Sequence, residues 1–121
     1  MKLIDTSVWI RFFNAGEPAT KNAELRELIR NGEAAFCDLV RLELQSCRQT
    51  ETRAIELLVA TLPVLEHSPE VWDRAYHIAR KCRKLGKPVP NTDILIHATA
   101  EEHHCAILHE DKHFDMLAQI K

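Results

Sequence analysis

Four acidic residues stand where the apolar residues around them give little reason for a charge: Asp5, Glu43, Asp93 and Asp111. Asp5 and Asp111 each follow a short apolar run of strand character. The carboxyl ends of parallel strands lie at one edge of a sheet, so we expect these acids to meet there. Gathered carboxylates repel one another and raise at least one pKa, and a hard divalent cation relieves that repulsion. The acids therefore predict a site for Mg²⁺, with Mn²⁺ as the alternative.

Three of the acids also have an ordinary explanation in helix capping. Asp5, or Thr6 beside it, can cap the helix that follows, and Asp111 can cap the last helix. Asp93 falls in the first turn of a helix, after a proline-bounded loop, where the helix dipole favours a carboxylate. The residues alone leave capping and metal binding open for each of these acids.

Glu43 is predicted on the inner stripe of its helix, where a charge is costly unless it is paired or bound to a metal. That stripe consists of Leu39, Leu42, Ser46 and Cys47. An ion pair with a neighbour such as Arg41 is the alternative to a metal, because buried carboxylates also pair for structural reasons.

The elements that must position the acids alternate between strand and helix patterns. The predicted strands are 2–5, 34–37, 62–66 and 106–108. The predicted helices are 6–14, 20–30, 38–47, 51–60, 69–85, 92–103 and one that begins at Asp111, with a break at 16–18. This alternation predicts an α/β fold, a parallel central sheet of four strands, with a fifth left open, and helices on both faces.

With these motifs the chain resembles the PIN-domain ribonucleases, and most closely the VapC-type toxins of prokaryotic toxin–antitoxin pairs, from residue 1 to about residue 117. The family opens with a strand that ends in Asp-Thr-Ser, as residues 3–7 do, and carries a Glu on its third helix, matching Glu43. Residues 90–100 satisfy its Pro-x-x-Asp-x-x-Ile-x-Ala-x-Ala pattern, and residues 108–114 satisfy its Leu-x-x-Asp-x-x-Phe pattern. Four motifs in the family's order make the resemblance specific.

The departures from the family pattern are three histidines and an early end. Family members often have Thr or Ser in place of His109, commonly Asp in place of His113, and usually a small residue in place of His97. These histidines leave open whether an imidazole lies beside the metal pocket and shifts the pH optimum. The sequence also ends soon after residues 114–117, where many members continue into a last edge strand.

The resemblance implies a metal-dependent endoribonuclease that hydrolyses RNA phosphodiester bonds with an activated water, leaving a 5′ phosphate and a 3′ hydroxyl. Asp5 and Asp93 would be the main metal ligands. Asp111 would complete the ligand set or hold a second ion, and Glu43 would orient or deprotonate the water.

The same resemblance implies protein partners. A small antitoxin would thread its C-terminal segment into the acidic pocket, where an Arg or Lys side chain competes with the metal. The family also commonly forms homodimers or larger toxin–antitoxin assemblies. Trp9, Phe12, Phe13 and Leu58 are candidates for an exposed apolar patch, although a place in the core suits each of them better.

Composition is consistent with one domain over residues 1–121, at 45% hydrophobic residues. No run of 18 apolar residues occurs and the N-terminus enters a strand directly, so we expect a soluble cytoplasmic protein without membrane contact. The cysteines lack Cys-x-x-Cys spacing, which favours reduced, buried thiols; they are Cys37, Cys47, Cys82 and Cys105. The His-Glu-x-x-His order of zinc proteases is missing, and His103-His104 is predicted to close a helix.

The net charge of −2 is not typical of a nucleic-acid binder. Setting the four candidate acids aside leaves 14 of 18 acidic residues against 16 basic ones, so the remaining surface is mildly positive. The dense basic stretch 80–87 either ends a helix or contacts RNA phosphates. Arg11, Arg41 and Arg48 are further candidates for phosphate contact.

Other enzyme classes fit less well. Phosphatases of the haloacid dehalogenase type need Asp-x-Asp, but residue 7 is Ser. A receiver-type phosphoaspartate switch needs a preceding acidic pair and a later Lys, and neither is evident. The alternative that remains is a catalytically silent PIN fold that serves antitoxin or partner binding, which the presence of all four acids argues against.

Overall fold

The central element is a parallel sheet of four strands in the order β3-β2-β1-β4. A computed structural model describes residues 1–14, 21–47 and 51–121. The strands are β1 (Lys2–Ile4), β2 (Ala34–Cys37), β3 (Val64–Leu65) and β4 (Ala106–Leu108). Leu3 of β1 is paired with Ala35 on one side and with Ile107 on the other. The first and last described strands are therefore neighbours, so residues far apart in sequence leave the sheet at the same edge.

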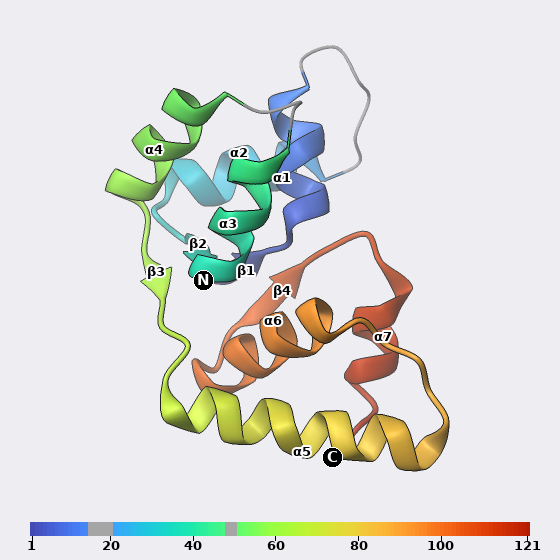
Figure 1. Cartoon of the computed structure of the whole chain (residues 1–121). Coiled ribbons are helices and arrows are strands. Elements are labelled where there is room, and N and C mark those ends of the chain that lie inside the picture. Colours follow the sequence, from blue (N-terminus) through green and yellow to red (C-terminus); the bar gives the residue numbers. More distant parts are fainter. Residues whose placement is uncertain (15–20, 48–50) are drawn as a thin grey trace.

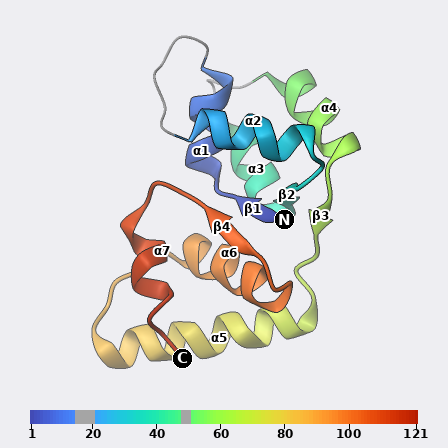
Figure 2. The same ribbon diagram turned by 180° about the vertical axis from the view of Figure 1, so that it is seen from behind.

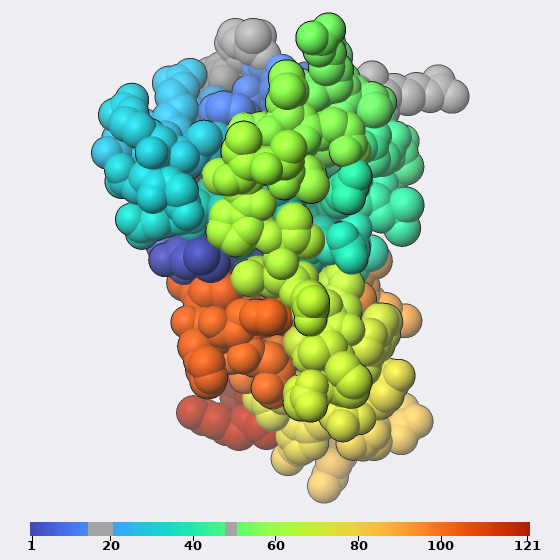
Figure 3. Space-filling model, turned by 90° about the vertical axis from the view of Figure 1, so that its left-hand side faces the viewer, coloured from blue at the N-terminus to red at the C-terminus, as the bar shows by residue number. Residues whose placement is uncertain are grey.

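Seven helices surround the sheet in the described part of the chain. They are α1 (Thr6–Phe13), α2 (Asn22–Arg30), α3 (Asp38–Ser46), α4 (Thr52–Thr61), α5 (Pro69–Leu85), α6 (Asn91–Glu102) and α7 (Lys112–Leu117). Figures 1 and 2 show α1 to α4 on one side of the sheet and α5 to α7 on the other. Figure 3 shows the flank where the chain runs from α4 through β3 into α5 and joins the two sides. The predicted α/β architecture with helices on both faces is confirmed.

The core forms where α1 and β2 meet. Trp9 is fully buried and stacks on Phe36 with ring centroids 4.6 Å apart, and Phe13 stacks on the other side at 5.9 Å. Large aromatic rings in such contact supply much of a small domain's apolar burial. Phe12 and Leu58 also pack against this core. The core interpretation of these aromatic residues is confirmed, and the exposed-patch interpretation is wrong.

Helix ends follow the predicted signals. Ser68 caps α5 by accepting a hydrogen bond from the Val71 N–H, and Gly86 ends it at a φ of 66°. The basic stretch 80–87 does therefore close a helix, where cations oppose the negative end of the dipole. His103 follows the last residue of α6, as predicted.

Several predicted bounds need correction. Most helices and strands differ from the prediction by one or two residues, while β2, β4 and α5 begin and end as predicted. β3 is shorter than the predicted 62–66, since only Val64–Leu65 pair with β2. Among the described residues no strand follows α7, so the fifth strand is absent from that part of the chain. The predicted break at 16–18, the helix start at Thr20 and the candidate Arg48 lie outside the described residues.

The predicted inner stripe of α3 is wrong. Leu42 is 66% exposed, and the residues that α3 buries are Val40 and Leu44, which face β2 and α1. Glu43 lies beside this buried face and is half-buried. Its position therefore depends on a specific partner rather than on burial in an apolar stripe.

The remaining general expectations concern thiols and membranes. None of the four cysteines forms a disulfide in the described segments; Cys37 and Cys82 are buried, and Cys47 and Cys105 are half-buried. Burial raises the pKa of the Cys37 thiol to about 11, which keeps it protonated and unreactive. In the described segments, every helix is too short or too polar to span a bilayer.

Candidate active site

Asp5 follows β1 directly and begins α1. Its N–H donates to the Leu108 carbonyl at 3.0 Å, which continues the pairing of β1 with β4. Its Oδ2 caps α1, accepting from the Ser7 hydroxyl at 2.6 Å and from the Ser7 N–H at 3.4 Å. The capping interpretation of Asp5 is thus correct. Both hydrogen bonds end on Oδ2, so the cap does not use Oδ1. The same carboxylate can therefore cap α1 and also act on the acids of α6 and α7.

Glu43 reaches the same region from α3. The Thr6 hydroxyl donates to its Oε1 at 2.6 Å, which ties Glu43 to the residue after Asp5. Arg41, the alternative partner, instead forms a two-pronged ion pair with Glu56 at 2.7 and 3.0 Å. The predicted pairing with Arg41 is therefore wrong, and the Glu43 carboxylate is held by a neutral hydroxyl.

Asp93 and Asp111 are joined by a histidine. The His113 Nδ1 lies 3.2 Å from Asp93 Oδ2 and 3.3 Å from Asp111 Oδ1. Asp111 caps α7, since its Oδ1 accepts the His113 N–H at 2.9 Å, and Asp93 lies in the first turn of α6. Both helix-end interpretations are correct here too. The three side chains nevertheless converge across two different helices, which capping alone does not require.

The electrostatics of the site centre on Asp93. Burial raises the pKa of its carboxyl, and the negative charges of Asp5 and Asp111 raise that pKa further. The hydrogen bond and charge of His113 lower it but do not cancel the rise. Repulsion among gathered acids predicts a raised pKa, and the pKa of Asp93 is indeed raised, with burial as the largest cause and the charges of Asp5 and Asp111 next. Both acids therefore act on Asp93.

The donor atoms suit a divalent cation. One donor atom each from Asp93, Asp111 and His113 lies within 4.8 Å of the other two. Carboxylate oxygens are the usual ligands of hard divalent ions, and an imidazole nitrogen is a common additional ligand. Within the described segments, Asp5 and Glu43 lie outside this tight group. The sequence predicted Asp5 as a metal ligand and left the role of His113 open, whereas in the structure His113 contacts both Asp93 and Asp111.

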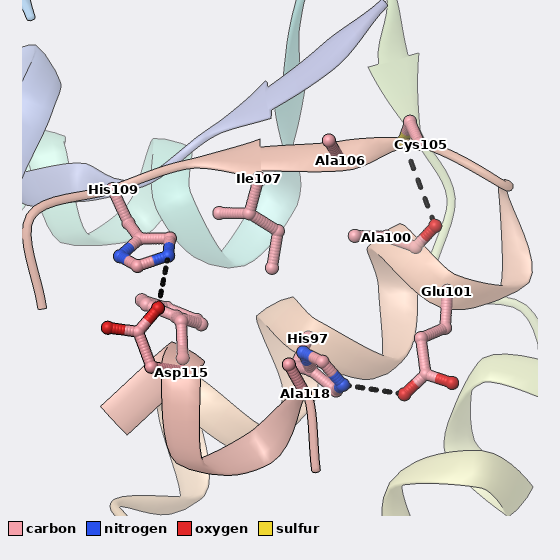
Figure 4. A pocket seen from close by; sticks show the side chains of 10 residues that line it. His97, Ala100, Glu101, Cys105, Ala106, Ile107, His109, Asp115 and Ala118 are labelled. Atoms are coloured by element: carbon pink, nitrogen blue, oxygen red, sulfur yellow. Dashed lines mark hydrogen bonds and ion pairs between the residues drawn. The ribbon is translucent and has the colours of Figure 1, made fainter. Parts of the chain in front are cut away.

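The other two histidines of interest line a separate cavity of about 220 Å³ between α6, β4 and α7. Figure 4 shows His97 there beside Glu101, with its Nε2 2.6 Å from the carboxylate, and His109 beside Asp115. Burial lowers the pKa of His97. His109 still touches the site, because its Nδ1 accepts the Asp111 N–H at 3.2 Å. His97 therefore belongs to the interior behind the acids, and His109 supports the loop that carries Asp111.

A polar groove of about 560 Å³ opens beside Asp111. Its basic lining residues are Lys2, Lys21 and Lys112, and Lys2 is paired with Glu24 at 2.6 Å. Arg11 of α1 pairs with Glu110, the residue before Asp111. The groove is also lined by Glu24, Glu110 and Asp115, so basic and further acidic side chains both lie on this side of Asp111.

Comparison with known sequences gives a consistent family. A family model described as the PIN domain matches residues 2–120. VapC ribonuclease Mb1587 of Mycobacterium bovis is 35% identical over 127 residues, covering 99% of this chain and 93% of that protein. Ribonuclease VapC19 of Mycobacterium tuberculosis is 35% identical over 102 residues, covering 83% of this chain and 80% of the relative.

Solved structures agree on the fold. VapBC2 from Rickettsia felis, bound to a DNA fragment from its promoter, superposes with a TM-score of 0.73 at 16% identity, covering 92% of this chain and 87% of that chain. FitAcB from Neisseria gonorrhoeae gives a TM-score of 0.70 at 18% identity, covering 99% and 94%. The full-length sequence match and the shared fold lead to one conclusion: the chain belongs to the PIN-domain family and, within it, to the VapC group.

Proposed function

We propose that this protein is a metal-dependent endoribonuclease that acts as the toxin of a toxin–antitoxin pair. The observation that carries the proposal is the convergence of Asp93 and Asp111 on His113, with the charge of Asp5 acting on Asp93. A partly buried carboxyl with a raised pKa beside like charges is typical of a functional site rather than of a structural ion pair. The relatives at 35% identity are named as ribonucleases, which supports RNA as the substrate.

Asp5, Asp93 and Asp111 are the residues we assign to holding Mg²⁺ or Mn²⁺. When bound, the ion would activate a water and stabilise negative charge on the phosphate and the leaving oxygen. Without it, burial and the negative charges of Asp5 and Asp111 raise the pKa of Asp93 and so disfavour the charged form of that carboxyl. The acids therefore supply the negative charge that makes cation binding favourable.

Glu43 is assigned to orient the attacking water and accept its proton. Its Oε1 is fixed by the Thr6 hydroxyl at 2.6 Å, so one carboxylate oxygen has a set position. Thr6 directly follows Asp5 in the chain. The hydrogen bond from Thr6 therefore keeps Glu43, the proposed base, close to Asp5, a proposed metal ligand. A positioned carboxylate base contributes about 10²- to 10⁴-fold to a hydrolysis rate.

Basic residues beside the acids are proposed to bind the RNA backbone. Lys21 and Lys112 line the groove next to Asp111, and either can neutralise a phosphate. Such contacts position a strand but do not choose its sequence. The resemblance to the PIN-domain ribonucleases supports hydrolysis that leaves a 5′ phosphate and a 3′ hydroxyl.

The proposed protein partner is a small antitoxin whose Arg or Lys side chain enters the acidic site. A guanidinium there would pair with Asp93 and Asp111 and take the place of the cation. The structural neighbours are VapBC complexes, which supports an assembly of this kind. Adding the antitoxin should suppress cleavage, and more Mn²⁺ should weaken that suppression.

We also propose that the toxin pairs with a second copy of itself. Trp72 and Tyr76 of α5 are 41% and 53% exposed and border an apolar groove of about 410 Å³. Apolar area of this kind suits a protein interface. Light scattering of the purified chain, before and after Tyr76→Glu, tests the pairing: a dimer that becomes monomeric supports it, and a monomer in both cases contradicts it.

The test of the function is RNA cleavage by purified protein in EDTA, Mg²⁺ or Mn²⁺. Wild type should cut a structured RNA pool only with metal, and Asp93→Asn should lose about 100-fold or more of the rate, which is about 3 kcal/mol of transition-state stabilisation. The matched control is Asp73→Asn, which removes an exposed acid of α5 and should cut as wild type does. Mapping the ends of the products tests the predicted 5′ phosphate.

Two outcomes would contradict the proposal. Cleavage that survives in EDTA or in Asp93→Asn would assign it to another site or to a contaminant. Absence of cleavage with every metal, together with tight antitoxin binding, would favour the catalytically silent PIN fold instead.

A further inference from the structure

We propose that His113 is itself a ligand of the metal ion, through Nδ1, and that the site therefore selects first-row transition ions such as Mn²⁺ over Mg²⁺. This inference rests on the proposed function, because it names a donor of the same site. It concerns a residue for which the sequence alone gave no role, at a position where the family commonly has Asp.

The spacing of the donor atoms supports direct ligation. The His113 Nδ1 is 3.2 Å from Asp93 Oδ2 and 3.3 Å from Asp111 Oδ1. Two ligands at right angles on an octahedral ion, each at about 2.1 Å, lie about 3 Å apart. The nitrogen is thus already spaced as a neighbouring ligand to both oxygens, and binding needs only small movements of side chains.

The alternative is that His113 only donates hydrogen bonds to the two acids. The ring Nδ1 has hydrogen-bond geometry only toward Asp93 Oδ2, at 3.2 Å, whereas its 3.3 Å contact with Asp111 Oδ1 is an ion-pair distance. One hydrogen bond therefore joins His113 to one of the two acids, whereas a cation can be shared by all three atoms. Proton and metal exclude each other on Nδ1, so binding releases any proton there to solvent.

The backbone prepares the ring for this role. The His113 N–H donates to Asp111 Oδ1 at 2.9 Å, which fixes the first turn of α7. The side chain remains 29% exposed, and that of Asp93 is 15% exposed, so an ion can reach both from solvent. Ring and acid are held on separate helices, α7 and α6, that pack against each other.

The chemical consequence is a change in metal preference. Mg²⁺ prefers oxygen ligands and keeps several waters, while an imidazole nitrogen favours transition ions in the order that begins with Mn²⁺. A site with an imidazole beside its carboxylates should therefore bind Mn²⁺ more tightly than Mg²⁺. Replacing the imidazole by an oxygen ligand should remove most of that difference.

The direct test is pulsed EPR of the full chain loaded with Mn²⁺, with RNA absent. Wild type should show the ¹⁴N coupling of a bound imidazole, and labelling the histidines with ¹⁵N should shift it. His113→Asn should lose the coupling. His77→Asn should keep it, because His77 lies on α5 and bonds the Lys121 carbonyl. His109→Gln should also keep it, which separates the two histidines nearest Asp111.

Calorimetric titration supplies the second readout. His113→Asn should weaken Mn²⁺ binding by about tenfold or more, the range seen when groups around a metal are removed, and should change Mg²⁺ binding less than about threefold. His113→Asp should restore tight binding without preference for Mn²⁺. Circular dichroism in EDTA checks that each variant is folded, and the wild-type EPR signal tests the proposal without any variant.

The possible failures are distinguishable. If wild type binds Mn²⁺ and cuts RNA but shows no ¹⁴N coupling, or keeps the coupling in His113→Asn, direct ligation is wrong and the proposed function stands. If wild type binds neither Mn²⁺ nor Mg²⁺, metal dependence itself is wrong.

Discussion

Two histidines each link α6 to another part of the molecule, and their surroundings are opposite. His67 lies between α3 and α6: its Nε2 accepts the Leu39 N–H at 3.2 Å, and its Nδ1 lies 2.9 Å from the Thr99 hydroxyl. That hydroxyl donates its own proton to the Leu95 carbonyl at 2.7 Å, so Nδ1 must be the donor. His113 instead faces the two carboxylates of Asp93 and Asp111.

The difference separates a structural contact from a functional one. Around His67 each donor meets one acceptor, and burial lowers the pKa of the ring so that it stays neutral. Around His113 two acids lie within 3.3 Å of one nitrogen, and burial and the charges of Asp5 and Asp111 raise the pKa of Asp93. Near Thr99, helix α6 is thus anchored by the neutral hydrogen bonds of His67, all of which have partners. Its unfavourable charge, that of Asp93, lies at the other end of the helix. An unfavourable charge that is kept at the Asp93 end of α6 is consistent with a function at that end.

The largest expected effect is on catalysis at the charged end. Glu43→Gln should lower single-turnover RNA cleavage by about 100-fold or more, because the amide cannot accept a proton from water. The variant should fold normally, since the amide oxygen can still accept from the Thr6 hydroxyl. Glu56→Gln, which removes an acid of α4 that pairs with Arg41, is the control and should stay within about twofold of wild type. Equal losses in both variants would argue against a specific role for Glu43.

The next effect is on stability at the neutral end. His67→Ala should lower the free energy of unfolding by about 2 kcal/mol, because the Leu39 N–H and the Thr99 hydroxyl lose their partner in a half-buried region. Urea titration followed by tryptophan fluorescence measures it. His77→Ala, at a half-buried ring on α5, should cost less than about 0.5 kcal/mol. A cost for His67→Ala as small as that of the control would refute the anchoring role.

A smaller effect is the pH dependence of that anchor. The pKa of His67 is lowered in the folded protein from its ordinary 6.5, so the unfolded chain binds the extra proton first. Its contribution to stability is present above pH 6.5 and is lost as the pH falls through the lowered folded-state pKa. The stability difference between wild type and His67→Ala should therefore shrink as the pH falls from 7 to 5. A difference that grows on acidification would mean that His67 is charged in the folded state.

Local sequence signals predicted most of the fold. Ser68-Pro69 at the start and Gly86 at the end gave the bounds of α5, because capping and the left-handed glycine are local effects. The stripe of α3 was mispredicted because which face a short helix buries depends on what it packs against. Leu42 has helical spacing to Leu39 but points away from β2 and α1.

The candidate site was predictable in its acids but not in its connections. The acids were recognisable from strand ends and from the family motifs. The Thr6–Glu43 bond joins residues 37 apart, and the His113–Asp93 contact joins residues 20 apart, so both depend on how helices pack. The one local signal for His113 was its place two residues after Asp111, where the ring returns to the acid that caps its own helix.

The cluster around Asp93 should destabilise the folded protein when no cation is bound and stabilise it when a cation is bound. The most direct measurement compares the unfolding free energy of wild type and Asp93→Asn at pH 7.5, first in EDTA and then in Mn²⁺ at about 100 times its dissociation constant. In EDTA, Asp93→Asn should be the more stable protein by about 1 kcal/mol, because it removes a buried charge between like charges. In Mn²⁺, wild type should gain about 2.7 kcal/mol and the variant much less, so that the order inverts. If the variant is the less stable protein in EDTA, or if Mn²⁺ stabilises both equally, Asp93 is a structural residue and the account is wrong.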